Sequence, residues 1–169
     1  LSARAGETTK LQSFLDDFVS QYSLESDLVL TSGEQVTIGL LSAELKNRGV
    51  KSIPLLGWQI PIITDDSHEK AKILNIDNKR IQKLFEKNDV IVLAGFQGIS
   101  LDGEITSLGR GGSDTTAVAI ASSVDAKRCD IYTDVDGVYT TDPNIDQNAK
   151  KISKMSYEEM LEMASTGSK

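Results

Sequence analysis

The stretch DVIVLAGF, residues 89–96, restricts the fold of this 169-residue chain more than any other feature. Its apolar side chains follow one another without alternation, which is typical of a β-strand covered on both faces. Strand patterns of this kind alternate along the chain with helical patterns, such as the apolar spacing from Leu11 to Tyr22. This alternation predicts an α/β fold with a largely parallel sheet.

The other elements are predicted from local signals. Asp102-Gly103 is a turn signal for a hairpin between two short strands. Thr8 or Thr9 is expected to cap the first helix, and Ser156 and Glu159 have capping-box spacing at the last one. Further helices are predicted at 33–48, 81–87, 114–124 and 156–165, a polar break at 20–27, and further strands at 51–57, 60–64, 129–134 and 137–141.

Composition excludes several function classes. The net charge is −7, which argues against nucleic acid as the main partner, because phosphate backbones are bound through clustered Lys and Arg. The single cysteine, Cys129, forms no internal disulfide and is expected to be a buried, inert thiol. One histidine, His68, excludes a metal site with several His or Cys ligands. No apolar run approaches the roughly 20 residues of a membrane span, so we expect no membrane partner and a cytoplasmic location.

The loop SLGRGGSDTT, residues 107–116, carries three glycines beside Arg110 and Asp114. It lies between a predicted strand and a helix start, where free N–H groups and the helix dipole favour anions. Arg110 offers a planar fork that binds a carboxylate through two hydrogen bonds. The alternatives are a tight turn, a surface salt bridge for Arg110, and helix capping by Ser113 or Asp114. The loop matches neither the P-loop nor the dinucleotide-binding glycine pattern.

Two more stretches hold candidate ligand-binding residues. Glu34 in TSGEQVT either interacts with a helix dipole or receives an amino group. YTDVDGVYTTDP, residues 132–143, follows a predicted buried strand, and its spacing does not fit a calcium loop. Turn formation accounts for Asp136-Gly137 and Asp142-Pro143, which leaves Thr133, Asp134 and Tyr139 as candidates for nucleotide or magnesium binding.

Together these stretches resemble the aspartate kinases, within the amino acid kinase family. The matching segments occur in the family's order and cover most of the chain: SARAGETTKL, LTSGEQVT, GWQIPIITDD, VLAGFQGIS, TSLGRGGSDTTAVAIA, IYTDVDGVYTTDP and KISKMSYEEMLEMASTGSK. The resemblance implies a three-layer αβα sandwich with a mostly parallel central sheet. It also implies transfer of a phosphoryl group from ATP to the side-chain carboxylate of L-aspartate, which opens the pathway to lysine, threonine, methionine and diaminopimelate.

The resemblance also implies roles for residues at matching positions. Asp114 falls on the catalytic aspartate, which organises lysines and the transferring phosphoryl group. Magnesium is expected on the phosphates of ATP, with no separate protein metal site. The residues implied to bind aspartate are Thr8, Glu34, Arg110 and Ser113. Those implied to lie near or bind the nucleotide are Ser2, Gly111, Gly112, Thr133, Asp134, Tyr139 and Lys169.

The chain departs from the family pattern in three ways. Asn144 stands where the family usually has an arginine, so one positive contact to the nucleotide is in doubt. The family's first strand, with its catalytic lysine, has no match, and neither do the rest of the kinase domain and the C-terminal ACT regulatory domains. Residues 1–169 are therefore expected to be a fragment of the catalytic domain, inactive alone, from an active and dimeric parent protein.

Two other functions stay open. The first is another amino acid kinase, with glutamate, N-acetylglutamate or a nucleoside monophosphate as acceptor. The second is a binding or regulatory module that keeps this fold without the chemistry, an idea that Asn144 supports and Glu34, Arg110, Asp114 and Asp134 oppose.

Overall fold

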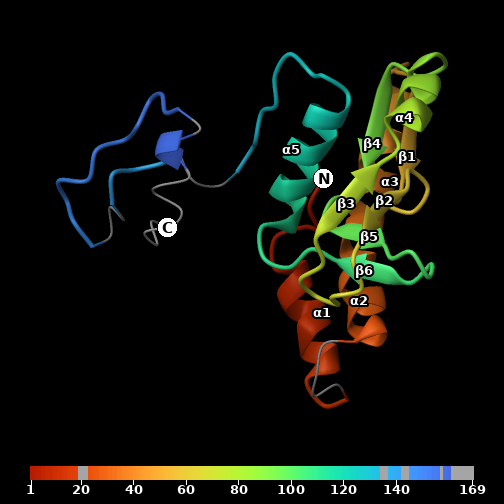
Figure 1. Cartoon of the computed structure of the whole chain (residues 1–169). Coiled ribbons are helices and arrows are strands. Elements are labelled where there is room, and N and C mark those ends of the chain that lie inside the picture. Colours follow the sequence, from red (N-terminus) through yellow and green to blue (C-terminus); the bar gives the residue numbers. More distant parts are fainter. Residues whose placement is uncertain (19–22, 134–136, 142–144, 157, 161–169) are drawn as a thin grey trace. The chain divides into compact units, whose positions relative to one another are not determined.

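The computed structural model describes residues 1–18, 23–133, 137–141, 145–156 and 158–160. The chain divides into two units, Leu1–Ile131 and Tyr132–Lys169. The described part of the first unit forms, in chain order (Figure 1), α1 (Glu7–Leu15), α2 (Leu24–Leu30), α3 (Ser32–Asn47), β1 (Ser52–Leu55), β2 (Ile62–Thr64), β3 (Ile73–Ile76), α4 (Asn78–Phe85), β4 (Val90–Leu93), β5 (Gln97–Ile99), β6 (Ile105–Ser107) and α5 (Gly112–Ser123).

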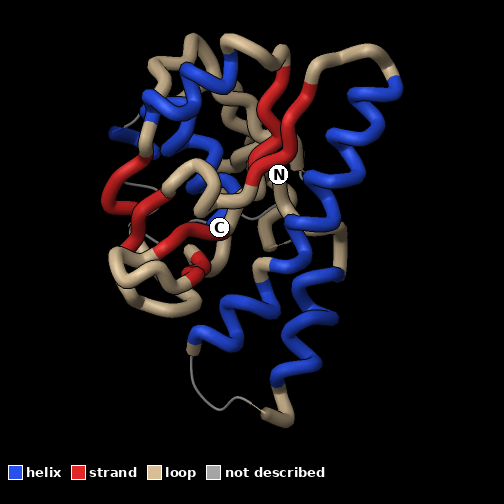
Figure 2. Tube along the Cα trace, turned by 90° about the vertical axis from the view of Figure 1, so that its right-hand side faces the viewer, coloured by secondary structure: helices blue, strands red, loops and turns tan. Residues whose placement is uncertain are grey.

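The apolar run at 89–96 forms β4, which pairs in parallel with β1. Helices cover both faces of this pair. Val92 packs against Ile38 of α3 on one face, whereas Leu55 packs against Ile81 of α4 on the other. The second cluster also takes in Ile120 from α5, and Figure 2 shows α3 running beside the paired strands. The α/β class is thereby confirmed, as an incomplete sandwich with helix, sheet and helix layers.

The remaining strands form a mixed sheet in the order β3-β2-β5-β6. β2 and β5 are parallel, and the two outer pairs are antiparallel. β5 and β6 form the hairpin expected from the sequence, with Gly103 at φ +86° in its turn. At the centre of the sheet, the hydroxyl groups of the buried Thr64 and Thr106 form a hydrogen bond of 2.6 Å.

The sequence predicts three helices close to their observed positions, whereas the predictions for the first two helices of the chain differ from the structure. α3, α4 and α5 lie where the sequence predicts helices. The first helix begins and ends earlier than the apolar spacing from Leu11 to Tyr22 predicts, and its N-cap is Gly6, so the prediction that Thr8 or Thr9 caps it is wrong. α2 begins inside the polar break predicted at 20–27 and extends to Leu30, and its N-terminus has a capping box formed by Ser23 and Ser26. Seven residues are too few to establish a helical period, so the sequence does not predict α2.

The strand predicted at 129–134 is wrong where the structure describes it. Residues 129–133 have no strand assignment, and Asp134 lies outside the described residues. Cys129 is exposed, which contradicts the expectation of a buried thiol, and the neighbouring Tyr132 is 94% exposed. Strand propensity reflects packing against neighbouring strands more than a backbone preference. The described residues provide no paired strand for this segment.

The second unit contains a short antiparallel contact between Tyr139 and Lys151. The predicted capping box is confirmed there, because Ser156 N donates to Glu159 Oε2 at 2.7 Å and Glu159 N donates to Ser156 Oγ at 3.2 Å. Across the described part of the chain, no helix combines the length and apolar character needed to cross a bilayer.

Gly98 of β5 provides a test of the packing in the mixed sheet. A Cβ atom there would collide with Thr64 Cγ2 and lie 2.7 Å from Ile62 O. We predict that Gly98→Ala lowers the free energy of unfolding by roughly 1–3 kcal/mol, as overpacking does. Gly39 in α3 has nothing within 4 Å of its Cβ position. The control Gly39→Ala should therefore raise stability by about 0.5–1 kcal/mol. Urea denaturation of both variants checks the pair, and equal stabilities would contradict the packing.

Candidate functional site

A cavity of about 530 Å³ opens in the first unit where several distant segments converge. Its lining comes from the N-terminal segment, the first three helices, the loop before β3, the segment after β4, and the glycine loop that leads into α5. Among its lining residues are eight of the residues predicted from the sequence: Ser2, Thr8, Glu34, Arg110, Gly111, Gly112, Ser113 and Asp114. We call this cavity the acceptor pocket, after the role that the family resemblance implies for Thr8, Glu34, Arg110 and Ser113.

The end of β4 holds the N-terminal segment against the acceptor pocket. Leu1 N donates to Leu93 O at 2.7 Å, and Gly95 N donates to Leu1 O at 2.9 Å. This alternation of donor and acceptor is that of a parallel ladder. It sets Ser2 and Ala3 beside the first turn of α3, where Glu34 lies.

The glycine loop, residues 107–116, runs from the end of β6 into the first turns of α5. Gly111, at φ +73°, is the N-cap of the helix, and no side chain caps it, so the alternative of capping by Ser113 or Asp114 is wrong. Both side chains instead line the pocket. A Cβ atom on Gly112 would lie 2.8 Å from the Phe96 ring, so only glycine fits at this close approach. The first-turn N–H groups of α5 give this end of the pocket a positive partial charge.

Glu34 is a buried carboxylate with one free oxygen. Its side chain is 3% exposed, and Oε1 accepts a hydrogen bond from Ala3 N at 2.9 Å. Among the described residues, Oε2 has no hydrogen-bond partner. Burial raises the pKa of Glu34 above its usual value, while the Ala3 N–H opposes that rise. An unpaired buried carboxylate is costly, and a bound cation would offset that cost.

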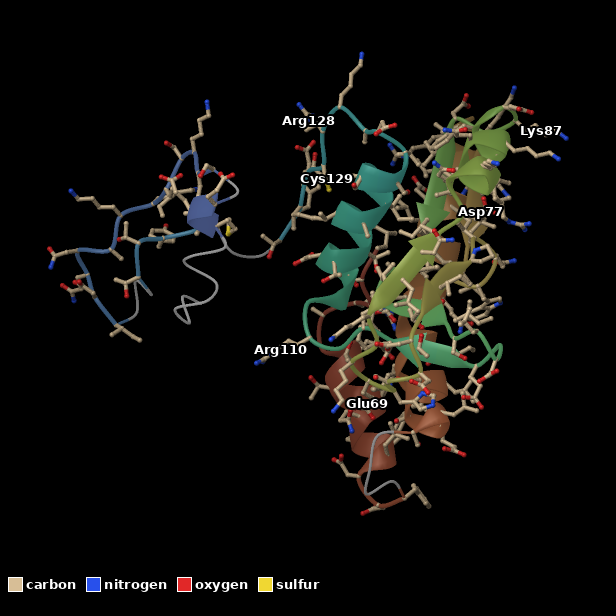
Figure 3. All side chains as sticks on the ribbon, viewed as in Figure 1. Glu69, Asp77, Lys87, Arg110, Arg128 and Cys129 are labelled. Carbon is tan, nitrogen blue, oxygen red and sulfur yellow. The ribbon has the colours of Figure 1, made fainter. Side chains whose placement is uncertain are left out.

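Arg110 and Thr8 lie on the exposed side of the pocket. Figure 3 shows the Arg110 side chain extending outward from the glycine loop. Within the part of the chain that the structure describes, Arg110 makes no ion pair. Its guanidinium is therefore available for an external carboxylate.

The predicted nucleotide contacts are divided between the units. Ser2, Gly111 and Gly112 line the acceptor pocket, whereas Thr133 and Tyr139 belong to the second unit. Asp134, Asn144 and Lys169 lie outside the described residues. In the described stretches, no group of three or more His, Cys, Asp or Glu side chains is arranged to hold a metal ion.

Sequence reasoning missed Glu69 and Phe96, which also line the pocket. Their φ values are +58° and +67°, a backbone conformation that residues other than glycine seldom adopt. A glycine at such a position signals the turn, but glutamate and phenylalanine do not. The remaining lining residues outside the predicted set are Ala3, Gln12, Leu30 and Gly109.

Comparisons with known proteins agree with this architecture. Residues 2–169 match the model of the amino acid kinase family. The chain is 51% identical over 170 residues to an aspartate kinase of Pseudomonas putida and 48% identical to an aspartokinase of Helicobacter pylori. It is covered completely in both matches and spans 41% and 42% of those proteins, about two fifths of their length.

Solved structures give the same result. Aspartokinase III of Escherichia coli, in complex with aspartate and ADP, superposes with a TM-score of 0.78 at 30% identity. That match covers 94% of this chain and 36% of the other. An isopentenyl phosphate kinase, at 17% identity and a TM-score of 0.61, shares the fold.

The free oxygen of Glu34 predicts an unusual stability effect. Because burial raises the pKa of Glu34 in the folded state, ionisation of its side chain opposes folding. This cost is complete at pH values above the folded-state pKa and absent at pH values below the unfolded-state pKa. We predict that Glu34→Gln stabilises the ligand-free protein by about 1 kcal/mol at neutral pH, and that this gain disappears toward pH 4. Thermal unfolding measured across pH checks both parts.

Glu44→Gln is the matched control, because Glu44 lies on the same helix but is exposed. We expect it to change stability by less than about 0.5 kcal/mol, as is usual for surface positions. A destabilised Glu34→Gln at neutral pH would contradict the assignment of an unpaired buried charge.

Proposed function

The chain belongs to the amino acid kinase family, and from this premise we propose that it is part of an aspartate kinase. The proposed reaction transfers the γ-phosphoryl group of ATP to the side-chain carboxylate of L-aspartate, giving 4-phospho-L-aspartate and ADP. Relatives named aspartate kinase and a structural neighbour in complex with aspartate and ADP support this assignment. The reaction would open lysine, threonine, methionine and diaminopimelate biosynthesis.

One observation carries the proposal: the acceptor pocket combines an unpaired buried carboxylate with an available guanidinium. Glu34 offers its free Oε2 to an ammonium group, and Arg110 offers its fork to a carboxylate. An amino acid with a free α-ammonium and a carboxylate matches both groups. We propose that Thr8 and Ser113, which line the same pocket, complete the aspartate site.

The unpaired Glu34 also bears on the alternative acceptors. N-acetylglutamate carries a neutral amide nitrogen and would leave the buried carboxylate without a cation. Free glutamate keeps the ammonium group and differs from aspartate by one methylene, so a direct comparison of acceptors distinguishes the two.

The chemical step needs positioning more than a strong base. The aspartate side chain is already ionised at neutral pH. One of its carboxylate oxygens forms a bond to the γ-phosphorus, while the bond from that phosphorus to the bridging oxygen of ADP breaks. Asp114, at the dipole end of α5, lies in the pocket lining and is the proposed organiser of the transferring group.

We propose that Mg²⁺ accompanies ATP and neutralises charge on its phosphates. The proposed nucleotide contacts are those implied by the family resemblance: Ser2, Gly111, Gly112, Thr133, Asp134, Tyr139 and Lys169. For the whole protein we propose a cytoplasmic homodimer in which further segments supply a lysine-bearing strand and ACT regulatory domains. The chain's share of its relatives' length supports the presence of such segments.

A trapping assay tests the activity. We predict that the full-length protein, mixed with Mg-ATP, L-aspartate and hydroxylamine, forms aspartyl hydroxamate, because hydroxylamine captures the acyl phosphate. The isolated 169-residue chain should form none. The assignment would be overturned if the full-length protein formed no hydroxamate with any acceptor. It would also be overturned if hydroxamate formed with glutamate or N-acetylglutamate but not with aspartate.

Arg110 provides a test of acceptor binding. We predict that Arg110→Ala raises the KM for aspartate roughly 10- to 100-fold, as expected for loss of a charge-assisted hydrogen-bond pair. Arg110→Lys should recover only part of that loss, because an ammonium group lacks the planar fork. The exposed Arg128, which pairs with Asp130, is the control, and Arg128→Ala should leave the KM unchanged. Equal KM values for all three variants would remove Arg110 from the site.

A further inference from the structure

Asp27 on α2 is a fully buried carboxylate, and nothing in the proposed reaction uses it. It accepts hydrogen bonds from two distant segments of the first unit. His68 Nδ1 lies 2.8 Å from Asp27 Oδ2, and Glu69 N donates to Oδ1 at 3.1 Å. Ser107 Oγ donates to the same Oδ1 at 2.5 Å. A buried carboxylate with this many donors is well compensated.

These side chains do not form a nucleophilic triad. The Ser107 hydroxyl donates to Asp27, not to His68, so no base is placed to activate it. The other nitrogen of His68 lies 3.7 Å from Glu104 Oε2, beyond hydrogen-bonding distance. The cluster therefore ties segments together and does not itself carry a reaction.

One of the tied segments holds Glu69 in the left-handed region, at φ +58°. Such a conformation is unfavourable for residues other than glycine, and it persists only where the surroundings fix it. The hydrogen bond from Glu69 N to Asp27, together with the His68 contact one residue earlier, fixes it here.

The backbone turn at Glu69, which we call the Glu69 turn, packs against the glycine loop. A Cβ atom on Gly109 would lie 2.7 Å from Glu69 O and 3.5 Å from Lys70 Cα. Gly109 is also at φ +73°, so its position requires glycine for both reasons. Next to this contact, Ala71 N donates to Ser107 O at 2.9 Å.

Both partners of this contact line the acceptor pocket. Glu69 and Gly109 form part of its wall, and Ser107 is the last residue of β6 before the glycine loop. Figure 3 shows Glu69 and Arg110 toward the same end of the first unit. A shift of the Glu69 turn would therefore move the loop that carries Arg110.

We propose that Asp27 is a positioning residue for aspartate binding, acting through the Glu69 turn and Ser107 on the glycine loop. The inference rests on the proposed function, because it concerns the acceptor pocket of that reaction. Asp27 binds no substrate in this role. It sets the position of the loop from which Arg110 and Ser113 reach the acceptor.

The test compares Asp27→Ala with Asp77→Ala in the full-length protein. Asp77 caps α4 through Arg80 N, and Figure 3 shows it away from Glu69 and Arg110, so its loss lowers stability without touching the pocket. We expect Asp27→Ala to raise the KM for aspartate roughly tenfold, whereas the KM for ATP, for which Gly111 and Gly112 of the same loop are proposed contacts, should change less. Asp77→Ala should leave both KM values unchanged. A purely structural role for Asp27 would lower kcat, through less folded enzyme, with unchanged KM values.

His68 supplies a milder pair of variants in case Asp27→Ala does not fold. Asparagine places a side-chain N–H close to the position of Nδ1, whereas phenylalanine keeps the ring without a donor. We expect His68→Phe to raise the KM for aspartate and His68→Asn to restore it. If the two variants share the wild-type KM, the positioning role is overturned.

Hydrogen exchange separates this inference from the proposed function. Backbone amides at 67–71 and 107–112 should exchange faster in Asp27→Ala and His68→Phe than in the wild type and in Asp77→Ala. Unchanged exchange would overturn the inference even in an active kinase. A wild-type protein that makes no hydroxamate would overturn the proposed function, and the exchange data would still decide whether Asp27 holds these two segments.

Discussion

The parallel pairing of β1 with β4, covered by helices on both faces, is the constraint on which the pocket depends. Because β4 is fixed by this burial, the chain leaves it at a defined point, where Gly95 packs against Ser113 and binds Leu1. Phe96 follows, and its N–H donates to Thr116 Oγ1 in α5 at 3.1 Å. The end of one buried strand thus places both the N-terminal segment and the start of α5, which are two walls of the site.

Two buried acids in the first unit show how hydrogen bonding distinguishes structural from binding roles. Asp27 and Glu34 are both almost fully buried. Asp27 accepts hydrogen bonds from His68, Glu69 and Ser107, and these contacts compensate its burial within the protein. Glu34 accepts one from Ala3, keeps a free oxygen within the described residues, and has a raised pKa. The first arrangement is complete by itself, whereas the second leaves one buried oxygen that a bound cation would compensate.

The sequence predicted those parts of the molecule whose signals are local. The hairpin follows from Asp102-Gly103, and α4 overlaps the short helix predicted at 81–87. The prediction of a strand at Cys129 was wrong because a strand needs a neighbouring strand to pair with, and the described residues provide none. Glu69 was missed because its left-handed conformation results from hydrogen bonding to Asp27, 42 positions away, and not from its own residue type.

The predicted site residues illustrate the same division. Eight of them line one pocket, because the motifs that contain them lie at the ends of elements that converge. Their roles in binding aspartate and ATP remain predictions from the family resemblance.

The uncompensated carboxylate of Glu34 also bears on how strongly the acceptor pocket would discriminate between ligands with and without an ammonium group. A site that buries an unpaired charge rejects a ligand lacking the matching group more strongly than an apolar pocket rejects a ligand of the wrong size. Succinate has the two carboxylates of aspartate but no ammonium, so its binding would leave Glu34 Oε2 buried and uncompensated. Glutamate keeps the ammonium and differs only in length, for which a methylene is worth about 1–3 kcal/mol. Under the proposed function, the charge at Glu34 would therefore select for an amino acid, and only the size of the pocket would separate aspartate from glutamate.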